Sequence, residues 1–291
     1  MTATYDKVNE DQWLLRHARD ITSLSGEDGI IEKIFEIIHP ANRWCVEFGA
    51  WDGRTFSNTY HLMKHAEWSG VFIEANGDKF QELLKTYQGN PRAHSLRRFV
   101  TFAGENSLDS LLRQTPLPKE FDLLSIDIDG NDYHVWESLT HYEPRVVIIE
   151  FNPTIPSRIE FIQPRDMRLQ QGSSLLSLIK LGKQKGYELV CVTEYNGIFV
   201  RSSLFPAFQI RDNSIYRLRP DTGSEFYLFQ LMDGTFVVGG QRLMPWQGLP
   251  IRQKDFQVVP KLFRAYPRES MSLWRRFLSR VWIWFYLKGI V

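Results

Sequence analysis

The sequence has few cysteines, no excess charge of either sign and no pattern of a secretory signal in its first residues. Both cysteines, Cys45 and Cys191, lie in apolar runs, which favours buried reduced thiols over a disulfide framework or a cysteine metal site. The 35 basic and 34 acidic side chains nearly cancel, so charge gives no reason to expect nucleic-acid binding. The first residues, MTATYDKVNEDQWLL, lack the apolar stretch of a signal peptide, and we therefore expect a cytoplasmic protein.

A dinucleotide-binding G-x-G-x-x-G motif is also missing, although the chain has the pattern of an open α/β sheet. Short apolar runs alternate with helical patterns, which is typical of a mostly parallel sheet with crossover helices on both faces. Strands are predicted over residues 43–48, 70–75, 94–102, 121–127, 145–151, 188–193 and 198–201.

Three helices are predicted around these strands. A polar helix is expected over residues 8–24, and Ser25 with Asp28 resembles a capping box that begins the next helix. A further helix over residues 172–187 would be capped by Ser173 or Ser174.

Two hairpins are predicted after the parallel strands. Asn196-Gly197 lies between two apolar runs, and this dipeptide strongly favours a hairpin turn, so the seventh strand should be antiparallel to the sixth. NAD-type domains end in a parallel strand, whereas a closing hairpin is typical of SAM-dependent methyltransferases. An oxidoreductase is therefore the weakest alternative. The second hairpin, with Asp233-Gly234 at its turn, is expected over residues 226–240.

The segment VEFGAWDGRTFSNTY (46–60) places a carboxylate in a buried strand directly before a glycine turn. Glu47, Gly49 and Gly53 form E-x-G-x-x-x-G at the end of the first predicted strand, where open α/β sheets bind ligands. Glycines let a ligand approach the backbone, and a carboxylate accepts hydrogen bonds from an amino group. Glu74 ends the second strand, where an acidic residue can bind both ribose hydroxyls. Together these features predict a nucleoside cofactor, although each also occurs at ordinary strand ends.

Acidic and amide side chains follow the fourth and fifth predicted strands. Asp127, with Glu150 or Asn152, would bind Mg²⁺, which prefers oxygen ligands. Asp129 or His134 would act as general base toward a substrate hydroxyl. The alternatives are that Asp127 binds cofactor or backbone groups, and that His134 faces the sheet.

The combined motifs resemble the FkbM-like branch of class I SAM-dependent methyltransferases. The resemblance covers roughly residues 24–205 and rests on SGEDGIIEKIF, WCVEFGAWDGRTFSNTY, GVFIEAN, FDLLSIDIDGNDYHVWESL, RVVIIEFNP and GSSLLSLIKLGKQKGYELVCVT. It implies a Rossmann-like seven-stranded sheet that binds S-adenosylmethionine at the ends of the first two strands.

The resemblance also implies roles for single residues. Glu47, Gly49 and Gly53 would contact the methionine part of the cofactor and Glu74 its ribose. The predicted cofactor-binding set is Glu47, Gly49, Ala50, Gly53, Glu74, Ala75 and Asp127. Asp127-Ile-Asp129 is similar to the D-x-D of metal-dependent sugar O-methyltransferases, where the first aspartate binds metal and the second acts as base. The fifth strand departs from that pattern, since it ends in Glu-Phe-Asn.

The last segment of the chain is basic and aromatic. SLWRRFLSRVWIWFYLKGIV (272–291) has helical apolar spacing with interspersed arginines, and its apolar run is too short to span a membrane. We expect either a helix at the inner face of a membrane or one that docks on the body or on a second subunit of a homo-oligomer. The predicted divisions are a helical lead (1–24), a methyltransferase domain (25–205), a β-hairpin appendage (206–269) and a tail helix (270–291).

Three functions are compatible with these patterns. The leading hypothesis is O-methylation of a hydroxyl on a sugar or glycan-like acceptor: an envelope polysaccharide, a lipid-linked saccharide or a glycosylated natural product. The D-x-D is also found in metal-dependent glycosyltransferases, but Glu47 would repel a diphosphate. The third hypothesis is a methyltransferase fold that only binds.

Overall fold

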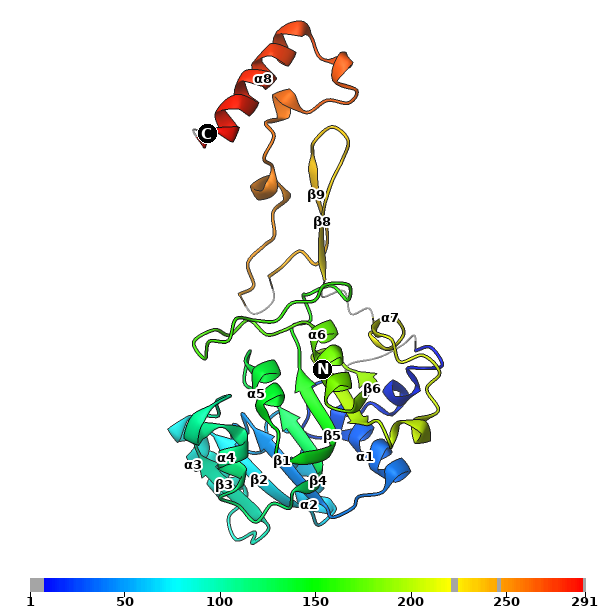
Figure 1. Ribbon diagram of the computed structural model, residues 1–291, viewed down its shortest axis with the longest axis vertical. Helices are drawn as coiled ribbons and strands as arrows, with labels where there is room; N and C mark the ends of the chain where they lie inside the picture. The colour runs from blue at the N-terminus through cyan, green and yellow to red at the C-terminus, as the bar shows by residue number, and fades with distance from the viewer. Residues whose placement is uncertain (1–7, 221–224, 245–246, 290–291) are drawn as a thin grey trace. The chain divides into compact units, whose positions relative to one another are not determined.

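The computed structural model describes residues 8–220, 225–244 and 247–289 (Figure 1). It consists of two compact units, Met1–Pro220 and Asp221–Val291, which are described separately.

The first unit is built on the predicted seven-stranded sheet. The strand order is β3-β2-β1-β4-β5-β7-β6, and every neighbouring pair is parallel except the two pairs that involve β7. This confirms the predicted Rossmann-like α/β fold with an antiparallel last strand. The strands are β1 (Trp44–Phe48), β2 (Ser69–Glu74), β3 (Ala93–Arg97), β4 (Glu120–Ile126), β5 (Glu143–Glu150), β6 (Tyr187–Val192) and β7 (Asn196–Arg201).

Apolar side chains on both faces explain why these runs form central strands. In β1 and β4, Val46 and Leu124 pair in register, and both are fully buried. Helix α5 (Asp132–Ser138) contacts both α4 (Leu108–Leu112) and α6 (Leu175–Gln184). The helices of this unit are η1 (Trp13–His17), α1 (Glu27–Ile38), α2 (Tyr60–His65), α3 (Gly77–Thr86), η2 (Gly104–Asn106), α4 (Leu108–Leu112), α5 (Asp132–Ser138), α6 (Leu175–Gln184), η3 (Phe205–Phe208) and α7 (Ile215–Leu218).

The predicted helix over residues 8–24, all of which the structure describes, is wrong because the short η1 is the only helix there. Residues after η1 fold around the buried Asp28 carboxylate, which accepts the backbone N–H groups of Ile21, Thr22 and Ser23 at 2.7–2.8 Å. The capping box at Ser25 is also wrong. The residue before α1 is Gly26, with a φ of 91°, and it makes no side-chain cap.

The cap predicted for the later helix is confirmed. The Ser174 side chain caps α6 by accepting a hydrogen bond from the Ser177 N–H. Of the two serines considered, Ser174 is therefore the capping residue.

The closing hairpin is confirmed, but its turn lies two residues earlier than predicted. The Thr193 N–H donates to the Asn196 carbonyl at 2.9 Å, so Glu194 and Tyr195 form the connection. The Asn196 side chain donates to Glu27 Oε1 at 3.0 Å. This long-range contact holds Asn196 at the start of β7 instead of in the turn.

The first unit continues to residue 220 instead of ending at the predicted 205. Arg217 binds Asp11 through its guanidinium, with Nη2 3.0 Å from Oδ2. Arg219 donates to the carbonyls of Pro153 and Ile155 at 2.6 and 2.8 Å. These contacts tie residues 205–220 to the sheet domain.

The second unit contains the predicted hairpin and the predicted last helix. β8 (Phe226–Gln230) and β9 (Phe236–Gly240) are antiparallel, with Gly234 at φ 90° in the turn. Short helices η4 (Gln253–Phe256), η5 (Lys261–Phe263) and η6 (Arg268–Ser270) lead to α8 (Leu273–Leu287). Among the described residues, none of the helices has the length and apolarity needed to cross a membrane.

Candidate functional site

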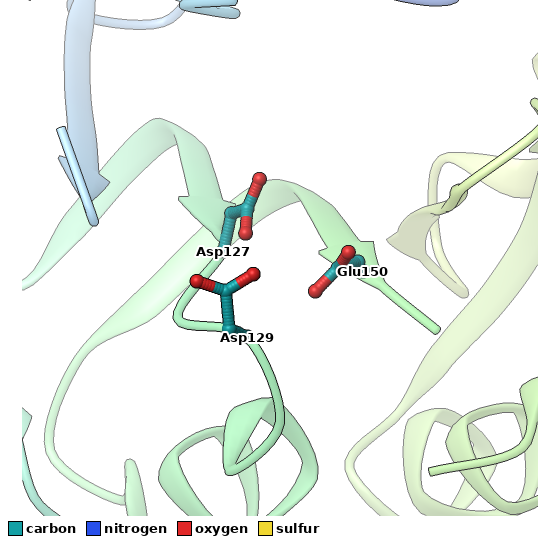
Figure 2. A group of neighbouring side chains, drawn as sticks. All are labelled: Asp127, Asp129 and Glu150. Carbon is teal, nitrogen blue, oxygen red and sulfur yellow. The ribbon is translucent and has the colours of Figure 1, made fainter. Parts of the chain in front are cut away.

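Three carboxyl groups meet at the carboxyl edge of the sheet. Asp127 and Asp129 follow β4, and Glu150 is the last residue of β5 (Figure 2). One oxygen from each lies within 4.8 Å of the others. β4 and β5 are adjacent and parallel, so the two strand ends bring these residues together as predicted.

The loop that carries the two aspartates is held by a fourth carboxylate. Asp132, buried at the start of α5, accepts the Ile128 N–H at 2.9 Å and the Gly130 N–H at 2.8 Å. Asp129 has a φ of 56°, a left-handed conformation that is uncommon for non-glycine residues and that aspartate tolerates better than most. Asp132 therefore fixes the backbone that presents Asp127 and Asp129.

Burial and neighbouring charges raise the pKa values of Asp127 and Glu150. Desolvation, followed by the charges of Asp132 and Asp129, raises the pKa of Asp127 to about 7. Desolvation and the charge of Asp127 raise the pKa of Glu150 well above its ordinary value. Asp127 and Asp129 are nevertheless exposed to solvent. Two carboxyl groups with raised pKa values, close to a third carboxylate, fit a divalent cation, which would compensate their mutual repulsion.

Glycine is required where the first loop passes the acidic one. Gly49 has a φ of 70°, and a Cβ there would lie 1.7 Å from the Asp127 carbonyl oxygen. At Gly53, with a φ of 73°, a Cβ would lie 2.5 Å from Leu83 and 2.8 Å from Tyr87. The E-x-G-x-x-x-G loop thus packs directly against the segment that carries Asp127.

Glu47, the carboxylate of that motif, is buried and bound by the chain itself. Its Oε1 accepts the Asn58 N–H at 2.8 Å, and its Oε2 accepts the Ser57 and Thr59 hydroxyls at 2.6 and 2.7 Å. Desolvation raises its pKa, and these three hydrogen bonds oppose the rise. Glu47 thus holds the segment before α2, a role that sequence reasoning missed although SNTY supplies the donors.

Glu74 is buried at the end of β2 and is also engaged. Its Oε2 accepts the Trp51 N–H at 2.8 Å and its Oε1 the Asn76 N–H at 2.6 Å. A carboxylate oxygen has two acceptor positions, so each oxygen keeps one for a ligand. Of the two alanines in the predicted cofactor set, Ala50 is buried and donates its N–H to the Ile73 carbonyl at 3.2 Å, whereas Ala75 is exposed.

Two other predicted site residues have hydrogen-bond partners in nearby loops. His134 is buried, and its Nε2 lies 2.8 Å from the Gln163 carbonyl oxygen. Asn152 donates to the Gln171 carbonyl at 2.7 Å, and its Oδ1 accepts from the Thr154 N–H and hydroxyl. His134 and Asn152 therefore already have partners within the protein, whereas Asp129 and Glu150 belong to the acidic group.

An exposed aromatic residue lies beside this edge, inside the glycine loop. Trp51 is about half exposed, has a φ of 49°, and has the Lys79 ammonium 4.7 Å from its ring centroid. Its position inside the glycine loop was the only signal available in the sequence.

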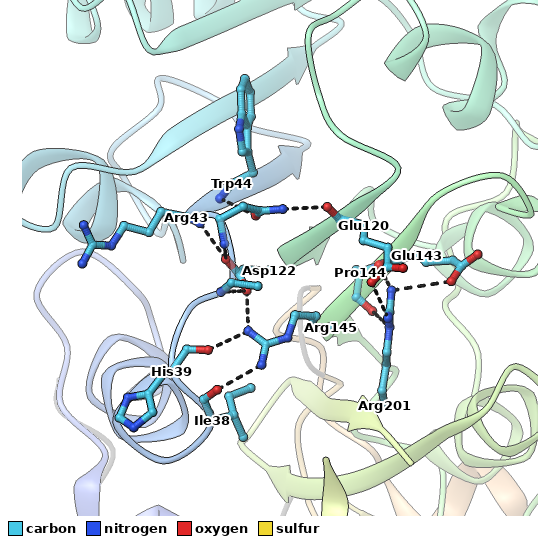
Figure 3. A network of polar contacts seen from close by, with 12 residues as sticks. Ile38, His39, Arg43, Trp44, Glu120, Asp122, Glu143, Pro144, Arg145 and Arg201 are labelled. Atoms are coloured by element: carbon cyan, nitrogen blue, oxygen red, sulfur yellow. Dashed lines mark hydrogen bonds and ion pairs between the residues drawn. The ribbon is translucent and has the colours of Figure 1, made fainter. Parts of the chain in front are cut away.

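The opposite edge of the sheet carries a structural ion pair instead of a site. Arg145 donates to Asp122 at 2.7 Å and to the carbonyls of Ile38 and His39 (Figure 3). Asp122 is fully buried and also accepts three backbone N–H groups, those of residues 41–43. These hydrogen bonds join α1 to β4 and β5.

Neither a family model nor a curated protein matches the sequence. Solved structures similar in fold include M. capricolum TrmK in complex with S-adenosyl-homocysteine (10% identity, 58% of this chain, 65% of that chain, TM-score 0.36). Another is an O-methyltransferase from neocarzinostatin biosynthesis in complex with S-adenosyl-L-homocysteine and 1,4-dihydroxy-2-naphthoic acid (14% identity, 55% of this chain, 50% of that chain, TM-score 0.34). A third is an S-adenosylmethionine-dependent methyltransferase from Clostridium acetobutylicum (9% identity, 60% of this chain, 90% of that chain, TM-score 0.39). The chain thus spans less than two thirds of the first two proteins, and the fold assignment rests on the strand order given above.

Proposed function

We propose that the protein is an S-adenosylmethionine-dependent methyltransferase of the FkbM-like type that methylates a hydroxyl group of a sugar or glycan. The observation that carries the proposal is the contact of the glycine loop after β1 with the acidic loop after β4, at the carboxyl edge of a sheet closed by an antiparallel β7. Ligands of open α/β sheets bind at this edge.

The residues at this edge fit the cofactor. Glu74 offers one acceptor position on each oxygen, which suits the two vicinal hydroxyls of a ribose. Glu47 Oε1 accepts one hydrogen bond from the described residues, that of Asn58, and keeps an acceptor position toward an ammonium group. The cofactor, when bound, supplies an activated methyl group. The remaining proposed contacts are Gly49, Ala50, Gly53, Ala75 and Asp127.

The acidic group is proposed to prepare the acceptor. Asp127 and Glu150 would hold a divalent cation such as Mg²⁺, which prefers oxygen ligands. Asp129, on the same loop and exposed to solvent, would accept the proton of the acceptor hydroxyl. Because the loop is fixed by Asp132, positioning should contribute much of the rate.

The same acidic group favours one competing function. Asp127 and Asp129 lie close enough to bind a metal together, as the D-x-D of a glycosyltransferase does with a nucleotide-sugar diphosphate. Two observations weigh against it: the antiparallel β7 closes the sheet, and the buried Glu47 lies in the neighbouring strand.

Isothermal titration calorimetry distinguishes the two functions. We expect S-adenosylhomocysteine to bind and a panel of nucleotide sugars, with Mg²⁺ present, to give no heat. Binding of the nucleotide sugars alone would overturn the proposal. If S-adenosylhomocysteine binds, transfer of a labelled methyl group to crude envelope glycans is the second measurement. Absence of transfer, with no effect of Asp129→Asn on any phenotype, would favour a non-catalytic binding module.

A further inference from the structure

The helix α8 presents an apolar face to solvent. Trp274, Phe277, Val281 and Trp284 recur at intervals of three or four residues, which places them on one side of the helix. Trp274 is 66% exposed, and Phe277 and Trp284 are each 55% exposed. Leu273, at the start of the helix, is 81% exposed. An apolar face of this kind indicates a binding surface.

The opposite side of α8 is packed within the second unit. The Arg268 guanidinium donates to the buried Ser279 hydroxyl at 3.2 Å, and the Trp282 and Phe263 rings lie 6.1 Å apart. Arg275 Nε donates to the Leu262 carbonyl at 3.0 Å. The helix therefore already uses one face to hold its own unit together, and the exposed face is the other one.

Basic residues accompany the exposed apolar face. Arg280 lies three residues after Phe277, at the border of this face, and Lys288 lies four residues after Trp284, at the C-terminal end of the face. Neither side chain has a hydrogen bond or ion pair with any residue in the described part of the chain, and both are exposed. Residues 272–291 contain four basic side chains and no acidic one.

The second unit as a whole also carries an excess of positive charge. Residues 221–291 contain ten Lys and Arg against five Asp and Glu, whereas residues 1–220 contain 25 against 29. The positive excess of the protein is therefore confined to the unit that carries α8. A helix with an apolar face rich in tryptophan and with flanking cations is complementary to the headgroup region of an anionic bilayer.

We propose that α8 lies in the plane of an anionic membrane surface, with Trp274, Phe277, Val281 and Trp284 inserted among the lipids and Arg280 and Lys288 at the phosphate groups. This inference depends on the second unit alone and holds whatever reaction the first unit performs.

Flotation of the full chain with lipid vesicles tests the proposal. We expect binding to phosphatidylcholine vesicles that contain about one third phosphatidylglycerol, and binding weaker by roughly tenfold or more to phosphatidylcholine alone. Raising the salt from about 0.1 M to about 0.5 M should weaken the binding. The charge-reversed variant R280E/K288E and the variant F277S/W284S, each changed only at exposed positions, should each lose at least roughly tenfold in partitioning.

A control variant and a second measurement separate lipid from protein contacts. Tyr216→Ser alters a side chain of the first unit that is 72% exposed and should leave vesicle binding unchanged. Equal binding to neutral and anionic vesicles would overturn the proposal, as would unchanged binding by the two α8 variants. It would also be overturned if light scattering after size-exclusion chromatography showed that F277S/W284S breaks an oligomer while vesicle binding persists, since the face would then be a contact between protein chains.

Discussion

The Asp132 carboxylate accepts the backbone N–H of Gly130 at 2.8 Å, and its second oxygen accepts that of Ile128. One buried side chain thus sets the shape of the loop between β4 and α5 without belonging to the exposed acidic group. Desolvation raises its pKa to about 6. The relationship separates a carboxylate that positions the loop from those that face a ligand.

Asp132→Ala should therefore weaken metal binding although Asp132 is not a proposed ligand. Loss of two charge-assisted hydrogen bonds at a buried site should also lower the free energy of unfolding by about 1–3 kcal/mol. Titration with Mn²⁺ and urea unfolding measure the two effects. Glu105→Ala, at an exposed position of η2, is the matched control and should change neither. Full Mn²⁺ affinity in Asp132→Ala would contradict the positioning role.

Much of the fold could be predicted because its strands are buried on both faces. Runs such as RVVIIEF are apolar through most of their length, and the approach of β4 and β5 brings Asp127, Asp129 and Glu150 together. The candidate ligands could be identified from their strand ends alone. The distances between their carboxyl oxygens could not be predicted, because those distances depend on the backbone of the loop that Asp132 holds.

The sequence-based predictions were wrong where a side chain binds the backbone of a neighbouring segment or a residue far away in the sequence. Asp28 binds three N–H groups of the preceding segment and prevents a helix there. Asn196 binds Glu27, which lies 169 residues away, and this contact moves the hairpin turn. Apolar periodicity and capping patterns do not specify such contacts. The internal donors to Glu47 and Glu74 were missed for the same reason.

Glu74→Ala is expected to weaken binding of S-adenosylhomocysteine by about 1–3 kcal/mol, because ribose hydroxyls would lose their acceptor in a partly buried site. Glu74→Gln keeps one acceptor oxygen and should lose less. Calorimetry measures both affinities, with Glu105→Gln as the control at an exposed glutamate. An affinity unchanged in Glu74→Ala would refute the proposed ribose contact.

Asp127 and Asp129 should differ when each is changed to asparagine. Asp127→Asn removes a proposed ligand charge and should lower Mn²⁺ affinity by about tenfold or more. Asp129→Asn removes the proposed base and should reduce methyl transfer by about 10²–10⁴-fold with Mn²⁺ affinity nearly unchanged. Chelation with EDTA should abolish transfer. If Asp129→Asn instead loses the metal, Asp129 is a ligand; if transfer survives EDTA, the cation is not needed.

Arg145→Met should destabilise the fold without altering the site. Removing the guanidinium leaves the fully buried Asp122 carboxylate without its ion-pair partner, at a cost of about 3–5 kcal/mol. Urea unfolding measures this loss. The affinity for S-adenosylhomocysteine, measured well below the unfolding transition, should stay the same because the pair lies at the opposite edge of the sheet from Asp127.

Arg168→Met is the matched control for the buried pair. Arg168 binds Asp166 at the protein surface, where water screens the interaction, so its loss should leave the free energy of unfolding nearly unchanged. Equal effects of the two arginine substitutions would contradict the role of the buried pair.

Glu47 should make stability depend on pH in the direction set by its burial. Its pKa is raised in the folded state, mainly by desolvation, above an ordinary value of 4.5. The folded state therefore binds more protons than the unfolded state above pH 4.5, so this residue's contribution to stability falls as pH rises through the raised pKa.

Glu47→Gln should remove that dependence. The amide of the variant cannot ionise, so the difference in unfolding free energy between the natural protein and the variant should shrink, or change sign, as pH rises from about 4.5 toward neutrality. Urea unfolding at a series of pH values measures it. Saturating S-adenosylhomocysteine should flatten the slope of the natural protein, because an ammonium group near Glu47 favours the ionised carboxylate. A slope that the ligand leaves unchanged would mean that the ammonium group binds elsewhere, and that Glu47 serves only to hold Ser57, Asn58 and Thr59.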